Sequence, residues 1–364
     1  MPVKILHAAD FHLDSPYASL TEEKARERRR EGRELLMELA RLANSEKCRI
    51  VLLSGDLFDS SASYHETLES MTKMLSEIKG EVFIAPGNHD YWSARSPYAF
   101  MELPENVHIF RSPQPRYFDI PELGTRVWGA GFTSPVCDSV LRGFRAGKSD
   151  LIELMCLHAD LTGGRYDPIT EEDVAASGLS YLALGHIHAF SGIKKAGNTV
   201  YAYPGSLEGR GFDETGPKGC IIGEVGKDKA ELHFVPLAKR QYELRSVDLT
   251  GAADALSAVK ASVGESDRQN VVRILLKGEW SGALDTEAIE KALEGSFYAL
   301  QLKDMTVPAR GVWDGLDEDS LKGLFLKSLK ESYEASDNES ERGRILLAAR
   351  YGIAALENRE DWRP

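Results

Sequence analysis

Short apolar runs alternate with segments of helical periodicity along the first half of the chain. Apolar runs bounded by polar or turn-forming residues predict buried strands, here at Val3–Ala8, Ile50–Leu53, Val82–Ala85, Val127–Ala130, Ile152–Leu157 and Tyr181–Leu184. Apolar residues at helical spacing predict helices in Glu31–Ala43 and His65–Ile78. This alternation indicates an α/β fold around a central sheet. Several of the strands end in polar clusters, where open α/β sheets hold their ligands.

The pattern changes after Tyr242. Strands and helices alternate again, in the order Leu244–Leu249, Asp254–Val263, Val271–Lys277, Thr286–Leu293 and Ala299–Met305, which predicts a small separate α/β module. Two amphipathic helices follow, one carrying Leu321–Leu329 and the other Ile345–Leu356. We therefore expect a main domain over residues 1–240, a small α/β domain over 241–310 and a helical segment over 311–364.

Composition is that of an ordinary globular protein: of 364 residues, 42% are hydrophobic and 28% charged. The four cysteines are widely spaced with no CxxC pair, which argues against a disulfide framework and a thiolate zinc site. The N-terminal stretch turns polar too early for a signal peptide, and no run approaches a membrane span. We expect a cytoplasmic protein without a membrane anchor.

The net charge of −13 argues against a protein that coats DNA unaided, because phosphate backbones are repelled by an acidic chain. The one basic-looking run, Lys24–Arg33, is mixed with acidic residues, and such a mixture is typical of a solvated helix face. No region of the sequence is basic enough to predict DNA binding by itself.

Chemistry concentrates in five clusters that follow predicted strands: Asp10-Phe11-His12, Gly55-Asp56, Gly87-Asn88-His89-Asp90, Leu157-His158-Ala159-Asp160 and Gly185-His186-Ile187-His188. They hold five of the nine histidines. Asp10 and His12 are two positions apart, as are His186 and His188, so on extended backbone both members of each pair project to one side, as chelation requires. Asn88 and His89 are adjacent, so one can bind a metal while the other faces a substrate.

Imidazole, carboxylate and amide oxygen without thiolate suit divalent ions such as Mn²⁺, Fe²⁺ or Zn²⁺. Seven candidate ligands exceed what one ion needs if water and substrate positions are to stay open. Two ions that share a bridging carboxylate account for the whole set, and Asp56, alone at its strand end, is the natural bridge. Glycines at 55, 87 and 185 allow the backbone to approach the ions closely.

The five clusters, in this order, resemble the motifs of the calcineurin-like metallophosphoesterases. Further blocks, His12–Pro16, Gly55–Asp59 and Tyr203–Glu208, narrow the resemblance to the DNA-repair exonuclease branch of SbcD-like and YhaO-like proteins. The tail, with Leu321–Phe325 and Ala349–Gly352, is most similar to the YhaO-like members. The resemblance implies a four-layer core of two central sheets flanked by helices, with a small α/β cap and a helical C-terminal tail.

The resemblance also divides the metal ligands between two ions that share one carboxylate: one ion takes Asp10, His12, Asp56 and His188, and the other takes Asp56, Asn88, His158 and His186. Mn²⁺ is the expected ion, with Fe²⁺ and Zn²⁺ as alternatives. His89 binds neither ion, and its family counterpart faces the phosphoryl group as an acid or charge stabiliser. Paired ions would activate water for attack on phosphorus and neutralise the developing charge.

Three functions are weighed for such a site. The first is a DNA exonuclease or endonuclease of DNA repair that works with an SMC-like ATPase subunit, as the resemblance implies. The second is a phosphatase or phosphodiesterase for a small phosphoester, and the third is a non-catalytic scaffold. A scaffold would be expected to have lost ligands, and a small-molecule enzyme needs no added module, so the nuclease is favoured.

Two further expectations concern ATP and oligomerisation. Gly211–Lys218 lacks the Gly-Lys-Ser/Thr of a phosphate loop, so this chain should not hydrolyse ATP itself. Helices expected at His65–Ile78 and Tyr91–Leu103 occupy positions where the resembled nucleases often dimerise, so a homodimer is an open alternative.

Overall fold

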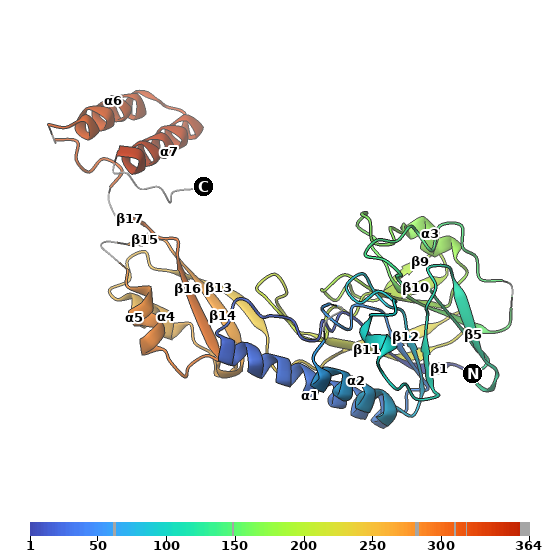
Figure 1. Cartoon of the computed structure of the whole chain (residues 1–364). Helices are drawn as coiled ribbons and strands as arrows, with labels where there is room; N and C mark the ends of the chain where they lie inside the picture. The colour runs from blue at the N-terminus through green and yellow to red at the C-terminus, as the bar shows by residue number, and fades with distance from the viewer. Residues whose placement is uncertain (61–62, 148, 281–283, 309–310, 318, 357–364) are drawn as a thin grey trace. The chain divides into compact units, whose positions relative to one another are not determined.

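Two six-stranded sheets form the larger part of the protein (Figure 1). The computed structural model describes residues 1–60, 63–147, 149–280, 284–308, 311–317 and 319–356. The first sheet has the order β12-β11-β1-β2-β3-β4, with β1 Val3–Ala8, β2 Ile50–Leu53, β3 Glu81–Ile84, β4 Val107–Ile109, β11 Gly219–Val225 and β12 Ala230–Pro236. The second has the order β5-β6-β7-β8-β10-β9, with β5 Arg116–Ile120, β6 Thr125–Gly129, β7 Ile152–His158, β8 Tyr181–Gly185, β9 Lys194–Ala196 and β10 Thr199–Ala202.

The two sheets pack face to face, with helices on their outer sides. Alternate residues of β2 point to opposite faces: Ile50 and Leu52 pack toward the second sheet, and Val51 and Leu53 pack toward the helices. Helices α1 (Glu22–Ser45) and α2 (His65–Glu77), which lie side by side in Figure 1, share the core of this outer face, and α3 (Glu171–Ala176) packs on the second sheet. The expected four-layer α/β core is confirmed.

Parallel pairing brings the carboxyl ends of neighbouring strands to the same edge of each sheet. β1, β2, β3 and β4 run parallel, as do β6, β7, β8 and β10. In the register of β7 and β8, His158 lies opposite Gly185, the residue that precedes His186. The sequence clusters at these strand ends are thereby placed at one edge of the double sheet.

The chain divides into two compact units. Met1–Leu244, Ser266–Arg273 and Phe297–Ala299 form the first, and Arg245–Glu265, Ile274–Ser296 and the described residues of Leu300–Pro364 form the second. The expected small module contains a three-stranded sheet, β13-β14-β16, and two short helices, α4 and α5. The elements of the module and of the segment that follows it are β13 Tyr242–Asp248, α4 Ala255–Ala261, β14 Val271–Lys277, β15 Glu279–Trp280, α5 Thr286–Ala292, β16 Ala299–Asp304, β17 Val307–Pro308, α6 Leu321–Ala335 and α7 Glu339–Leu356. The domain boundary at residue 240 stays a prediction, and the one at 310 falls outside the described residues.

Two sequence expectations about helices were wrong in part. Tyr91–Leu103 is not a helix: it contains one short 3₁₀ turn, Pro97–Ala99, and Trp92 N donates to Phe132 O instead of to a helical partner. Helix α1 begins at Glu22, with Thr21 as its N-cap, nine residues before the predicted start. Its first half is polar in sequence but not fully solvated, because Arg28 and Glu31 are buried.

Arg28 is the centre of a buried ion-pair network in the first unit. Its Nη1 lies 2.7 Å from Glu208 Oε1 and donates to Glu31 Oε2 at 2.9 Å, and its Nη2 donates to the carbonyl of Gly209. Tyr17 donates to the other oxygen of Glu208. Burial raises the pKa of Glu208 even though Arg28 lowers it, so the carboxylate depends on this cation. The network therefore ties α1 to the loop that follows β10.

We expect Arg28→Met to destabilise the protein by about 3–5 kcal/mol, because it leaves a buried carboxylate without its counter-ion. Chemical unfolding measures this change. Arg26→Met is the matched control, since Arg26 is exposed and solvent screens its pair with Glu22. Adding Glu208→Gln to Arg28→Met should recover part of the loss, and equal effects of Arg26→Met and Arg28→Met would contradict the prediction.

No helix in the described part of the chain is long and apolar enough to cross a membrane. The four cysteines are all free, and three of them are buried.

Candidate metal centre

The residues predicted as ligands lie at the carboxyl ends of five strands from both sheets. Asp10 and His12 follow β1, Asp56 follows β2, and Asn88 follows β3. From the second sheet, His158 is the last residue of β7, and His186 and His188 follow β8. Residues far apart in sequence are therefore brought to one end of the sandwich.

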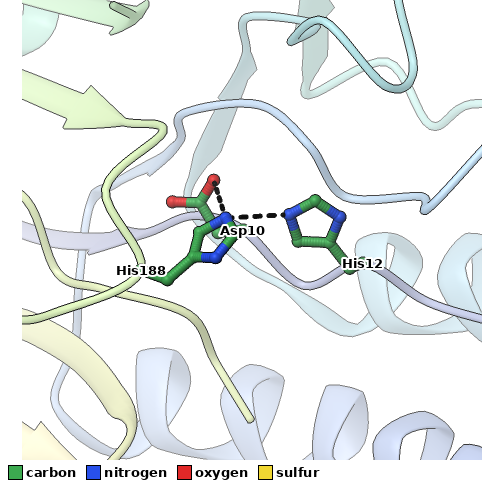
Figure 2. A group of neighbouring side chains, drawn as sticks. All are labelled: Asp10, His12 and His188. Atoms are coloured by element: carbon green, nitrogen blue, oxygen red, sulfur yellow. Dashed lines mark hydrogen bonds and ion pairs between the residues drawn. The ribbon is translucent and has the colours of Figure 1, made fainter. Parts of the chain in front are cut away.

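Asp10, His12 and His188 form one cluster (Figure 2). His12 Nε2 lies 3.2 Å from His188 Nε2, and His188 Nε2 lies 3.9 Å from Asp10 Oδ1. Two imidazole nitrogens this close need a proton or a cation between them, because their lone pairs otherwise repel. With a carboxylate beside them, they form a suitable site for a divalent cation.

Asp56 stands between two clusters of imidazoles. Its Oδ2 lies 3.7 Å from His12 Nε2 and 3.3 Å from His158 Nε2, while its Oδ1 accepts from the backbone N of His89 at 2.9 Å. One carboxylate oxygen thus faces ligands that the sequence analysis assigned to different ions. This is the position expected of a bridging carboxylate.

The other side of Asp56 is formed by His158 and Asn88. His158 Nε2 lies 3.0 Å from Asn88 Oδ1, and His158 Nδ1 donates to the carbonyl of Ser54 at 3.0 Å. The ring of His186 lies 5.2 Å from that of His158, and its backbone N donates to Asp10. Its Nε2 is nearest to Asp160, at 3.8 Å.

Ligand atoms from the described His, Cys, Asp and Glu residues approach within 4.8 Å of one another in three groups, Asp10–His12–His188, His12–Asp56–His89 and Asp10–Asp56–His158. His186 belongs to none of them. His89 does belong to one, although the sequence analysis left it unligated. Most of the seven predicted ligands therefore lie close together, and His186 lies at the edge of the group.

The charges in this cluster attract cations. Burial raises the pKa of Asp56, but His158, His12 and His89 lower it by more, so that the pKa lies below its usual range. Burial lowers the pKa of His158, but Asp56 and Asp10 outweigh this and raise it to about 10. The carboxylates that draw a proton to His158 would equally draw a metal ion. Donor set and electrostatics therefore fit a divalent-metal site.

Several of these residues adopt a backbone conformation that side chains other than glycine rarely take. The φ angles are 54° at Asp10, 42° at His12, 50° at Asp56 and 109° at His186. The expectation that Asp10 and His12 share one side of extended backbone was therefore wrong in its reason, since both have a positive φ and are not extended. Such strain persists only where the surroundings hold it, and it is concentrated at functional sites.

Gly87 is required by the close approach of Asp56. A Cβ at this position would lie 2.2 Å from Asp56 Oδ1. We expect Gly87→Ala to displace the bridging carboxylate and to weaken Mn²⁺ binding about tenfold to a hundredfold, as measured by calorimetric titration. Gly147→Ala is the control, because a Cβ there meets nothing within 4 Å. Equal affinities of the two variants would show that Asp56 does not need this space.

His89 is exposed, and its ring is held from one side only. Its Nδ1 donates to the carbonyl of Asp59 at 2.9 Å, which leaves Nε2 free. Asp90, the next residue, is buried and accepts from the backbone N of Gly87 and Leu57 and from Tyr98 Oη. Asp90 therefore fixes the turn that carries Asn88 and His89.

The structure adds charged residues around the cluster that the sequence analysis did not select. Asp59 lies beside His12, Glu214 lies beside His188, and Arg210 lies between these two acids. Asp59 belongs to the motif Gly55–Asp59. Glu214 lies in Gly211–Lys218, which was considered above only as a phosphate loop. The contact between Arg210 and Asp59 spans 151 positions of sequence, so spacing could not have found it.

Two facing sheets with an aspartate and histidine cluster at their strand ends define the class of metallophosphoesterases. The chain belongs to the calcineurin-like phosphoesterase family, whose model matches residues 3–190. This confirms the resemblance noted in the sequence and makes the protein a member of a family of metal-dependent phosphoesterases.

Relatives include a protein of Bacillus subtilis (strain 168) described as the uncharacterized metallophosphoesterase YhaO, 29% identical over 83% of this chain and 81% of that protein. The DNA double-strand break repair protein Mre11 of Saccharolobus solfataricus is 24% identical over 76% of each chain. The SbcD component of the nuclease SbcCD of Bacillus subtilis (strain 168) is 25% identical over 59% of this chain and 64% of that protein.

Proposed function

We propose that the protein is a two-metal-ion phosphodiester hydrolase and that its substrate is DNA. The observation that carries the proposal is the position of Asp56, whose Oδ2 faces both His12 and His158. A carboxylate that faces two sets of imidazoles is the group that two ions would share.

One ion would be held by Asp10, His12, Asp56 and His188, and the other by Asp56, Asn88, His158 and His186. The ions would supply activation of water and neutralisation of charge on the phosphoryl group. Mn²⁺ is the proposed ion, with Fe²⁺ and Zn²⁺ as alternatives, because nitrogen and oxygen ligands without thiolate accept all three. Together the ions bring +4 against the two aspartates, so the pocket favours a phosphodiester despite the acidic chain.

His89 is proposed as the group that acts on the substrate directly. Its Nδ1 is committed to the Asp59 carbonyl, so the proton of the charged ring that can be transferred is the one on Nε2. Placed beside the ions, Nε2 can donate to the leaving oxygen or stabilise the charge on the phosphoryl group.

A DNA substrate is supported by the descriptions of two relatives, a DNA double-strand break repair protein and a component of a nuclease. By the same analogy we propose an SMC-like ATPase partner and a role in DNA repair in the cytoplasm. The domain at 241–310 would cap the active site, and the helical segment at 311–364 would dock the partner. A homodimer remains an alternative, although its proposed surface has lost one predicted helix at Tyr91–Leu103.

The test is an assay of the purified chain with Mn²⁺ on linear duplex DNA, on bis-p-nitrophenyl phosphate and on p-nitrophenyl phosphate. Mn²⁺-dependent degradation of DNA that is lost in Asp56→Asn is the expected result. Turnover of the monoester alone would favour a phosphatase for a small phosphoester, the second candidate. No turnover of any of the three, with metal bound, would leave the non-catalytic scaffold.

A further inference from the structure

We infer that Glu214, Asp59 and Arg210 form an outer set of contacts that fixes the rings of His188 and His12 and makes their ion position the tighter of the two. The inference rests on the proposed function, because it assumes that His188 and His12 are metal ligands. It extends that proposal to residues that would touch neither metal nor substrate, so they are positioning residues.

Glu214 determines which nitrogen of His188 is free. Its Oε1 lies 2.9 Å from His188 Nδ1, and a carboxylate can only accept. A proton on Nδ1 leaves the lone pair on Nε2, the atom that faces His12 at 3.2 Å. Glu214 is buried, and Arg210 Nη2 lies 2.6 Å from its Oε1. An imidazole bonded to a carboxylate is also a more basic ligand.

Arg210 favours the opposite tautomer of the His188 ring. Its Nη2 lies 3.0 Å from the same His188 Nδ1, and a guanidinium can only donate. If this contact prevailed, the proton would sit on Nε2 and the ring would not bind a metal. Arg210 also donates to both oxygens of Glu214. The guanidinium is therefore hydrogen-bonded to the acid, and the acid can accept a hydrogen bond from a protonated Nδ1. Loss of the acid's charge should therefore shift the ring toward the wrong tautomer.

Asp59 lies beside the other ligand at ion-pair distance, although His12 Nδ1 makes no hydrogen bond in the structure. Its Oδ1 lies 3.2 Å from His12 Nδ1 and 3.2 Å from Arg210 Nη1. One arginine thus joins two acids, each of which lies against a ligand of the same ion.

The backbone of this ion position is held by the same loop. The carbonyl of His188 accepts from Lys218 Nζ at 2.6 Å and from Ser206 N at 3.2 Å. Lys218 and Arg210 balance the charges of Glu214 and Asp59, so two ionised acids are tolerated in a largely buried place. The stretch 206–218 is therefore a support for one metal position.

The second ion position has weaker support. His158 Nδ1 donates to the neutral carbonyl of Ser54, and His186 Nε2 is 3.8 Å from its nearest acid. A carbonyl is a poorer acceptor than a carboxylate and polarises the ring less. The two ions should therefore bind in two steps, the first at the position supported by Glu214 and Asp59.

Titration of the metal-free full chain with Mn²⁺, followed by calorimetry and by the EPR signal of free Mn²⁺, tests this directly. The wild type should bind two ions with unequal affinities. Glu214→Gln should weaken the tighter step about tenfold to a hundredfold and leave the weaker step within a few-fold. Glu153→Gln is the matched control: Glu153 is equally buried and accepts two hydrogen bonds, but it lies at the opposite end of β7 from His158.

Two further variants assign the steps and protect the test against misfolding. Asp59→Asn, which keeps the backbone carbonyl that His89 uses, should also weaken the tighter step, and Asn88→Ala should remove the weaker one. The inference is overturned if Glu214→Gln and Asp59→Asn leave the tighter step unchanged, or lower both steps equally. A wild-type chain that binds no Mn²⁺ would sink the proposed function itself, which is a different result.

Discussion

Asp56→Asn is expected to abolish the hydrolase activity and to lower bound Mn²⁺ from two ions to one or none. The charged carboxylate whose Oδ2 faces His12 and His158 would become a neutral amide. An amide oxygen or nitrogen would then occupy the position of Oδ2. Since metal ions contribute several kcal/mol to such reactions, the rate should fall about a thousandfold or more. Steady-state kinetics with bis-p-nitrophenyl phosphate and metal analysis of the same preparation measure both effects.

Asp167→Asn serves as the control for Asp56→Asn. Asp167 is also buried, and burial raises its pKa to about 7, so its charge contributes little that the variant would lose. This variant should keep its metal and activity. If Asp56→Asn retains two ions and near-normal turnover, Asp56 is not the bridge, and the two-ion mechanism fails with it.

His89→Ala should lower kcat on DNA about 10²- to 10⁴-fold while two Mn²⁺ ions remain bound. The ring is exposed, with Nδ1 fixed by the Asp59 carbonyl and Nε2 free to face a substrate. If His89 protonates the leaving oxygen, bis-p-nitrophenyl phosphate should suffer less, because nitrophenolate leaves without a proton. Comparison of the two substrates therefore separates proton transfer from charge stabilisation.

His65→Ala is the matched control, since His65 is another exposed histidine, paired with Glu69 at the start of α2. It should leave both rates unchanged. The structure also places a ring nitrogen of His89 within 4.8 Å of His12 and Asp56. A fall in bound Mn²⁺ in His89→Ala would therefore identify His89 as a ligand and contradict its assignment as the acid.

The strands that build the site were predictable because they are buried on both faces. β1 and β2 have the predicted bounds, and β3, β6, β7 and β8 differ by one or two residues. A parallel strand between two layers shows as a continuous apolar run, which is the strongest signal that sequence offers for a strand. The polar clusters after these runs then located the candidate ligands.

Elements at the edges gave weaker signals. The edge strands β4, β5, β9 and β12 were not among the predicted strands, because half-buried strands mix polar and apolar residues. Tyr91–Leu103 has helix-like apolar spacing, but Pro97 and the bond from Trp92 N to Phe132 O hold it in another conformation. Long-range contacts therefore outweighed the local preference for a helix.

Sequence alone determined the α/β class, the buried central strands and the set of candidate chelating residues, because apolar runs and residue chemistry are local properties. Only the tertiary structure decided how these residues meet: that Asp10 and His12 adopt positive φ angles, that His186 lies apart from the three closest groups, and that Arg28 is buried. It also decided that Glu214 and Asp59 lie against two ligands through one arginine. Such contacts join positions far apart along the chain, so they exist only after the two sheets have packed together.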